Sequence, residues 1–187
     1  GNSLVSDESV TAEAIDWEKA FPEVFSGEQG GFDCVIGNPP WERMKLQERE
    51  FFDGRDSSIA TAVNAAKRRQ LIEKLPKKNP ELYQAYIEAQ KQAEDNLHYV
   101  RTCGRYPLTQ KGDINTYAVF AELAHTIVSP DGFVGFLVPS GIATDNTTKK
   151  FFAKLVDTKV LSGLYDFENR KKIFTDVDGR FKFSILL

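Results

Sequence analysis

The chain has 187 residues, of which 41% are hydrophobic and 27% are charged, which is the composition of a globular domain with a core of its own. Its net charge of −3 excludes nucleic-acid binding through an overall basic character, so any contact with DNA must come from a local patch. The sequence has no signal peptide, no C-x-x-C pair and no apolar run of the roughly 18 residues that a membrane helix needs. It therefore predicts a cytoplasmic protein without membrane partner, disulfide framework or metal site.

Residues 1–31 are predicted to be a polar lead-in of short helical turns around one apolar cluster, followed by a glycine-containing loop. The next five residues, 32–36, have the pattern of a short buried strand. This strand is expected to end at Gly37-Asn38-Pro39-Pro40, because two successive prolines lack the N–H groups that would continue a strand ladder.

Residues 42–111 form a long polar segment with helical patterning. The spacing of Ile59, Ala62, Val63 and Ala66 predicts one helix, and a second helix is expected to begin after Asn79, a good N-cap residue followed by Pro80. Connections between elements usually span about 4–6 residues. We therefore interpret residues 42–111 as a helical insertion with structure of its own.

Beyond the insertion, the pattern alternates between helices and strands, which predicts an α/β fold. A helix is expected from about residue 115 to 127, a turn over 129–132, and an apolar strand over 133–138 with both faces buried in a parallel sheet. A helix that buries Phe151, Phe152, Leu155 and Val156 should follow, and then strands over 161–167 and 181–187. The sequence stops inside that last apolar run, so we expect it to be a fragment of a longer polypeptide.

The residues Asn38-Pro39-Pro40-Trp41 stand at the carboxyl end of the first predicted strand, the edge at which open α/β sheets bind ligands. Their chemistry suits a ring amine such as that of adenine, whose lone pair is delocalised into the ring. The Asn38 side-chain oxygen and the Pro39 carbonyl can accept both N–H groups and turn the lone pair toward an incoming methyl group. Trp41 offers a flat face to a planar base, and such stacking contributes roughly 1–3 kcal/mol.

The strand and the motif together resemble motif IV of the S-adenosylmethionine-dependent amino-methyltransferases. The lead-in is similar to that of large methylases from bacterial restriction–modification and phage-defence systems, through Asp16-Trp17, Phe21-Pro22-Glu23-Val24-Phe25 and Gly31. The downstream order also matches, with a helix, a strand ending in Val138-Pro139-Ser140, a helix and two strands. The resemblance covers most of the chain except residues 42–111.

This resemblance implies part of a class I, Rossmann-like methyltransferase sheet with flanking helices, in a bacterial cytoplasmic enzyme that methylates adenine in double-stranded DNA. It implies catalytic roles for Asn38, Pro39, Pro40 and Trp41, acting on an adenine flipped out of the duplex. It also implies that Phe174, in Lys172-Ile173-Phe174, packs on the flipped base together with Trp41. The alternative for Phe174 is an ordinary core phenylalanine.

The implied cofactor is S-adenosylmethionine, yet Gly27, Gly30 and Gly31 do not form the glycine-rich strand-turn-helix with which such enzymes bind it. We therefore expect residues 32–187 to be the substrate-side half of a methyltransferase domain. The rest of the parent polypeptide would be its partner and would hold the cofactor. The isolated chain is expected to be inactive and to bind S-adenosylmethionine weakly or not at all.

Six basic residues of the insertion form a local patch of the kind that DNA contact would need: Lys67, Arg68, Arg69, Lys74, Lys77 and Lys78. They are either a solvated helix face or a set of contacts to DNA phosphates.

Two other functions stay open at this point. Protein glutamine and ribosomal RNA guanine methyltransferases use a similar motif, because an amide or ring amine poses the same lone-pair problem. The tryptophan and the long insertion favour DNA. A fragment that serves only as an interaction module is the other alternative, and it would tolerate the loss of Asn38.

Overall fold

The computed structural model describes residues 2–27, 29–175 and 177–187. The chain divides into two compact units. The first comprises the described residues of Gly1–Glu42 together with Tyr99–Leu187, and the second is Arg43–His98. Whether the second unit is an insertion into a methyltransferase domain stays a prediction.

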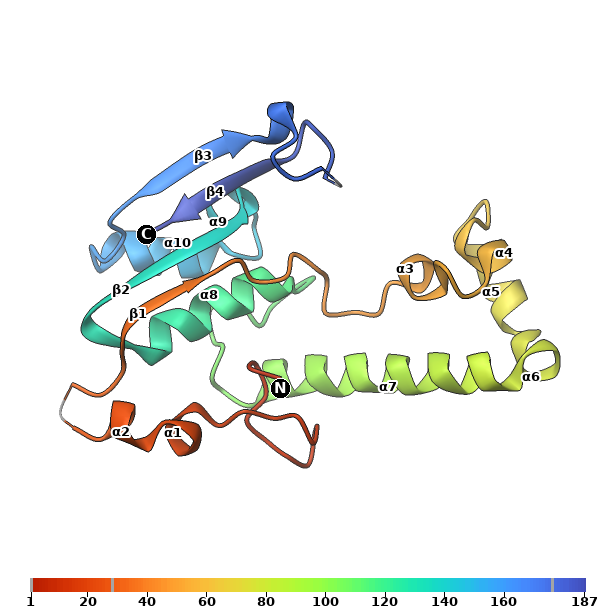
Figure 1. Cartoon of the computed structure of the whole chain (residues 1–187), viewed down its shortest axis with the longest axis horizontal. Coiled ribbons are helices and arrows are strands. Elements are labelled where there is room, and N and C mark those ends of the chain that lie inside the picture. The colour runs from red at the N-terminus through yellow and green to blue at the C-terminus, as the bar shows by residue number, and fades with distance from the viewer. Residues whose placement is uncertain (1, 28, 176) are drawn as a thin grey trace. The chain divides into compact units, whose positions relative to one another are not determined.

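The described residues of the first unit form a four-stranded sheet from β1 (Phe32–Gly37), β2 (Val128–Pro139), β3 (Leu164–Glu168) and β4 (Lys182–Leu186). The strand order is β1-β2-β4-β3, as Figure 1 shows, with helices α8 (Thr116–Ile127) and α10 (Lys149–Asp157) along the sheet. The sheet and its flanking helices confirm the predicted α/β class and are consistent with a methyltransferase-like fold.

The core of this unit lies between the sheet and the helices. Tyr117, Ala121 and Ala124 of α8 pack with Phe136 and Val138 of β2, because a helix places residues three and four apart on one face and a strand alternates its side chains. The other buried members of this cluster are Ala118, Ile142, Phe151, Leu155 and Leu186. In α10, Phe151 and Leu155 are buried as predicted, but Val156 is 48% exposed, because it lies off the stripe that these two residues form.

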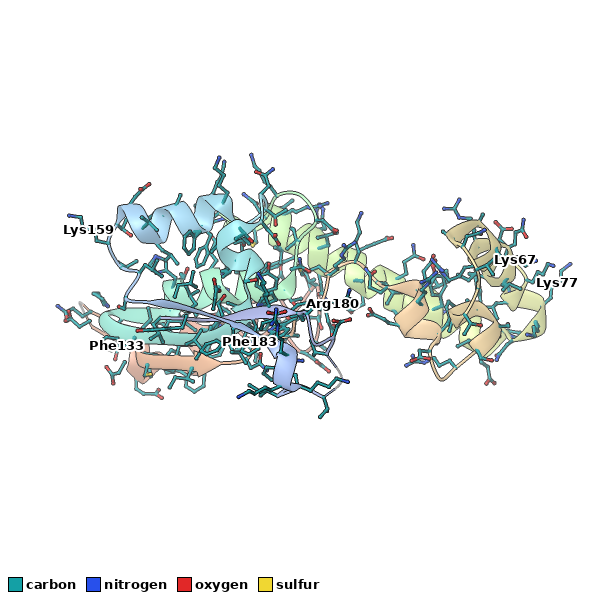
Figure 2. All side chains as sticks on the ribbon, turned by 90° about the horizontal axis from the view of Figure 1, so that it is seen from above. Lys67, Lys77, Phe133, Lys159, Arg180 and Phe183 are labelled. Atoms are coloured by element: carbon teal, nitrogen blue, oxygen red, sulfur yellow. The ribbon has the colours of Figure 1, made fainter. Side chains whose placement is uncertain are left out.

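The expectation of a parallel sheet with a fully buried strand is only partly right. β1 and β2 are parallel, but β4 is antiparallel to both β2 and β3. Ile36 of β1 and Phe133 of β2 point to the face opposite α8, where they are 81% and 69% exposed. Phe133, which is labelled in Figure 2, lies in the middle of β2. The helices cover one face of the sheet. Because side chains alternate along a strand, every second apolar residue lies on the opposite face.

The expected turn over 129–132 is wrong. These residues lie within β2, where Val128 pairs with Phe32 and Phe133 pairs with Cys34, so that the intervening residues bulge out of the ladder. A Cβ atom on Gly132 would come within 2.7 Å of the Phe32 carbonyl oxygen. The glycine therefore lets the bulge pass close to β1, and the strand continues where the Pro-Asp-Gly sequence suggested a break.

The lead-in packs against the start of β1 through aromatic rings. Trp17 of α1 (Trp17–Ala20) and Phe25 of α2 (Pro22–Phe25) each meet the Phe32 ring edge-on, with ring centroids 5.8 and 5.6 Å apart. The phenol of Tyr106, fully buried, donates to the Leu4 carbonyl at 2.7 Å. The lead-in is thereby part of the first unit.

The second unit contains α3 (Glu48–Phe52), α4 (Ser57–Ala60), α5 (Ala65–Ile72), α6 (Leu75–Lys78) and most of α7 (Pro80–Thr102). Its core consists of Phe52, Ile59, Ile72, Leu75 and Tyr86. The side-chain oxygen of Asn79 accepts from Leu82 N at 3.1 Å, which confirms the predicted cap of α7.

The single helix expected around residues 59–66 is wrong. Asn64 accepts from Lys67 N at 2.8 Å and starts a new helix, α5, so that Val63 lies outside any helix and is 85% exposed.

Candidate active site

One edge of the sheet collects the carboxyl ends of three strands. β1 and β2 are parallel, and β3 runs in the same direction as β2 because both are antiparallel to β4. The motif that follows β1 and the connection 169–181 from β3 to β4 therefore leave from the same edge. In open α/β sheets, this is the edge at which ligands bind.

The motif presents two acceptors that other groups of the chain leave free. Asn38 is exposed and Pro39 is buried. No hydrogen bond joins the Asn38 side chain or the Pro39 carbonyl to any residue in the described ranges. Both oxygens therefore have hydrogen-bond acceptor capacity that the described residues do not use.

The motif loop itself is fixed by neighbouring elements. The Thr116 hydroxyl, at the first residue of α8, lies 2.6 Å from the Pro40 carbonyl oxygen and 3.1 Å from that of Glu42. The backbone N–H of Thr116 donates to the Glu42 carbonyl at 2.9 Å, and the indole N–H of Trp41 donates to the Leu137 carbonyl at 3.4 Å. The direction of the neighbouring Pro39 carbonyl is thereby set in advance of any ligand.

A cluster of aromatic rings stands beside the motif. The Trp41 and Phe174 ring centroids are 5.8 Å apart with an interplanar angle of 67°, so the structure brings these two predicted residues together from distant parts of the sequence. Phe181 lies nearly parallel to Trp41 at 5.5 Å, and Phe183 meets the Phe174 ring edge-on at 5.2 Å. Trp41 and Phe174 are both partly exposed. A base can stack on Trp41 only where Phe181 leaves the ring uncovered.

Thr116, Phe181 and Phe183 were not among the predicted site residues. The alternation of a strand places Phe181 and Phe183 on one side, and this signal could have been used because both lie in the predicted strand 181–187. The Thr116 hydroxyl bonds to the backbone carbonyl of Pro40, which is distant in the sequence. No residue spacing in the sequence predicts such a contact.

The α8 end that carries Thr116 is also held to the segment after β2. The phenol of Tyr117 lies 3.5 Å from Asp145 Oδ2. Burial, and then the nearby Asp145 carboxylate, raise the pKa of Tyr117 to about 12. Tyr117 is therefore a neutral hydrogen-bond donor at physiological pH.

A cavity of about 320 Å³ lies against the motif. It is lined by residues 37–40, by Ser3 and Trp17 of the lead-in, and by apolar residues of β1, β2 and α8. No charged side chain of the described residues lines it. S-adenosylmethionine carries ribose hydroxyls, an amino group and a carboxylate, which need polar partners. The lining of this cavity therefore does not fit the whole of S-adenosylmethionine, because it offers no charged partner among the described residues.

A larger cavity, of about 650 Å³, lies around the first residues of β2 and contains none of the predicted site residues.

The six basic residues of the second unit do not form one uniform surface. Arg68 Nε lies 2.8 Å from Glu48 Oε2 and its side chain is 12% exposed, while Lys78 Nζ lies 3.5 Å from Asp56 Oδ2. Lys67, Arg69, Lys74 and Lys77 are exposed and form no ion pair with another described residue. Figure 2 shows Lys67 and Lys77 directed away from the helices. These four are the freer candidates for contact with phosphates.

Within the described ranges, no group of three histidine, cysteine or acidic side chains is placed to hold a metal ion. Cys34 and Cys103 are free thiols. None of the helices that the structure describes has both the length and the apolar character to span a membrane.

The four-stranded α/β sheet with its flanking helices is consistent with the class of methyltransferase-like folds. The Eco57I restriction-modification methylase family model matches residues 2–100 and 85–174, which include both the Asn38–Trp41 motif and Phe174. The chain belongs to this family, and membership supports DNA methyl transfer within restriction–modification. A methylase family also implies S-adenosylmethionine as methyl donor in general. Neither a curated protein nor a solved structure matches the chain.

Proposed function

We propose that the chain holds and activates the exocyclic amine of adenine in DNA for methyl transfer from S-adenosylmethionine. The observation that carries this proposal is the pair of free acceptors, the Asn38 side-chain oxygen and the Pro39 carbonyl, beside the rings of Trp41 and Phe174.

The acceptors solve the problem that the amine poses. The adenine amine conjugates its lone pair with the ring and is a poor nucleophile. When both of its N–H groups donate to fixed acceptors, the nitrogen is drawn toward a tetrahedral shape and its lone pair points out of the ring plane. S-adenosylmethionine supplies the methyl group when bound. The amine becomes acidic only after it has been methylated, so an amide at residue 38 serves better than a carboxylate base.

The aromatic rings provide the place for the base. The adenine would leave the duplex, at a cost of a few kcal/mol, and stack against Trp41. The Phe174 ring, tilted by 67° to that of Trp41, would then meet the edge or the second face of the base. Stacking of this kind contributes roughly 1–3 kcal/mol per base and offsets the cost of extrusion.

We infer that the cofactor is held mainly by residues outside this chain, because the cavity at the motif offers it no charged partner among the described residues. The free lysines and Arg69 of the second unit would contact DNA phosphates, which position the duplex without reading its sequence.

The proposal is tested by replacing Asn38 with alanine in the natural polypeptide that carries this sequence, here called the parent polypeptide. Loss of one of the two acceptors should lower the rate of adenine methylation about 10²–10³-fold, as the loss of one oxyanion-hole donor does in other enzymes. Gln84→Ala, which removes an exposed amide in the second unit, is the control and should leave the rate unchanged. Methylation that persists in Asn38→Ala would contradict the proposal and favour an interaction module.

A further inference from the structure

The connection between β3 and β4 is organised by one side chain. Asn169 begins the 3-10 turn η1 (Asn169–Lys171) and is 0% exposed, which is unusual for an asparagine. A buried amide is stable only when its polar atoms are hydrogen-bonded.

The Asn169 amide meets this requirement through the backbone of Phe174. Its Nδ2 donates to the Phe174 carbonyl at 2.8 Å, and its Oδ1 accepts from the Phe174 N–H at 3.1 Å. The second Nδ2 proton goes to the Val177 carbonyl at 2.9 Å. Both polar groups of the Phe174 main chain are therefore bound by the Asn169 side chain, and the Phe174 carbonyl also accepts from the Val177 N–H at 3.2 Å.

The hydrogen bonds from the Asn169 side chain to the Phe174 backbone are here called the Asn169 clamp. The backbone of Asn169 is itself held by hydrogen bonds. The Asn169 N–H donates to the Phe181 carbonyl at 2.9 Å, and the Lys172 N–H donates to the Asn169 carbonyl at 2.8 Å. Lys172 has a φ of 49°, so the chain reverses there before it reaches Phe174. The clamp thus connects the strand ends to the residue whose ring meets Trp41.

We propose that Asn169 is a positioning residue for methyl transfer, which holds Phe174 in the place where its ring packs on the flipped base. The inference rests on the proposed function, since it needs Phe174 to contact the base. Phe174 lies in an irregular connection, where no strand ladder fixes its backbone. The Asn169 amide takes the place of that ladder.

The structural half of the proposal is tested by amide hydrogen exchange in the parent polypeptide. Asn169→Ala removes the acceptor of the Phe174 N–H, and we expect that amide to exchange at least about tenfold faster. The control is Thr109→Val, which removes another buried hydrogen bond of the first unit, to Glu122 Oε2, and should leave Phe174 unchanged. Unchanged exchange at Phe174 in Asn169→Ala would overturn the proposal. If Asn169→Ala does not fold, Asn169→Ser replaces it.

The functional half is tested by a double-mutant cycle on methylation of an adenine duplex. Asn169→Ala should lower kcat about tenfold with little change in KM for DNA, because the base is misplaced while the rest of the DNA interface remains. In a Phe174→Ala background the same substitution should have almost no further effect, because its target is gone. Independent, multiplying effects of the two substitutions would overturn the positioning role.

The two proposals fail in different ways. A parent polypeptide that methylates no adenine would contradict the proposed function, and hydrogen exchange would still decide whether Asn169 holds Phe174. A polypeptide that methylates adenine normally after Asn169→Ala would overturn the positioning role alone.

Discussion

The loop that carries the motif is held in place by a residue of a neighbouring helix. Thr116 has one hydroxyl proton to donate, and the Pro40 carbonyl oxygen at 2.6 Å is its shortest contact. The position of Asn38, Pro39, Pro40 and Trp41 directly after the first strand could be predicted from their sequence pattern alone, and their chemistry stays a proposal. Thr116 and Asn169 could not, because each binds backbone groups of residues that only the fold brings near.

Replacing Thr116 with valine tests this fixation. Valine has nearly the same shape, but it leaves the Pro40 carbonyl without the hydroxyl donor and loosens the loop that carries the Pro39 acceptor. Loss of such a hydrogen bond costs about 1–3 kcal/mol, and we expect a fall in methylation rate of about tenfold or more. Thr116→Ser keeps the hydroxyl and should retain the wild-type rate. Equal rates for the valine and serine variants would exclude a role for the hydroxyl.

At the scale of elements, the strands and helices of the first unit were mostly predictable from hydrophobic periodicity. The exceptions have physical causes. Residues 129–132 form a bulge in place of the expected turn, because Gly132 lets β2 pass close to β1. This contact between two strands cannot be predicted from a local turn pattern. The antiparallel insertion of β4 between β2 and β3 is likewise a property of the whole sheet.

Helix α8 carries a titratable residue whose effect on stability can be measured. Burial, and then the nearby Lys154, lower the pKa of His125, whose ring meets Phe151 edge-on. A histidine with a lowered pKa in the folded state favours the neutral form, so its stabilising effect is present above pH 6.5 and is lost as the pH falls through the lowered value. The thermal midpoint should therefore fall between pH 7 and pH 5, and His125→Gln should reduce that fall. An unchanged pH dependence in the variant would refute this assignment.

Helices α5 and α6 and the turn between them carry the proposed phosphate contacts. Replacing Lys67, Arg69, Lys74 and Lys77 with glutamine should reduce the slope of log affinity against log salt for duplex DNA, by about 0.9 for each phosphate that is no longer neutralised. Arg68 is left in place because it pairs with Glu48 inside the unit. A control that neutralises Lys19, Lys91, Lys154 and Lys159 changes the net charge equally and should leave the slope nearly unchanged. Equal slopes in the two variants would show that no local patch acts.

For the whole molecule, the proposed division is that this chain binds the base while other residues of the parent polypeptide bind the cofactor, since no charged side chain of the described residues lines the cavity at the motif. We therefore expect the isolated chain to show no binding of S-adenosylmethionine in a calorimetric titration at micromolar concentrations. Micromolar affinity would contradict the expectation that the cofactor is held mainly by residues outside this chain.

The central claim is that this edge activates the adenine amine, and the product of the reaction tests it most directly. The parent polypeptide should be incubated with duplex DNA and methyl-labelled S-adenosylmethionine, and the nucleosides should be separated and identified by mass spectrometry. We predict that the label appears on the exocyclic nitrogen of adenine and is lost in Asn38→Ala. Label on another nucleoside or on protein, or label on adenine that does not depend on Asn38, would contradict this claim.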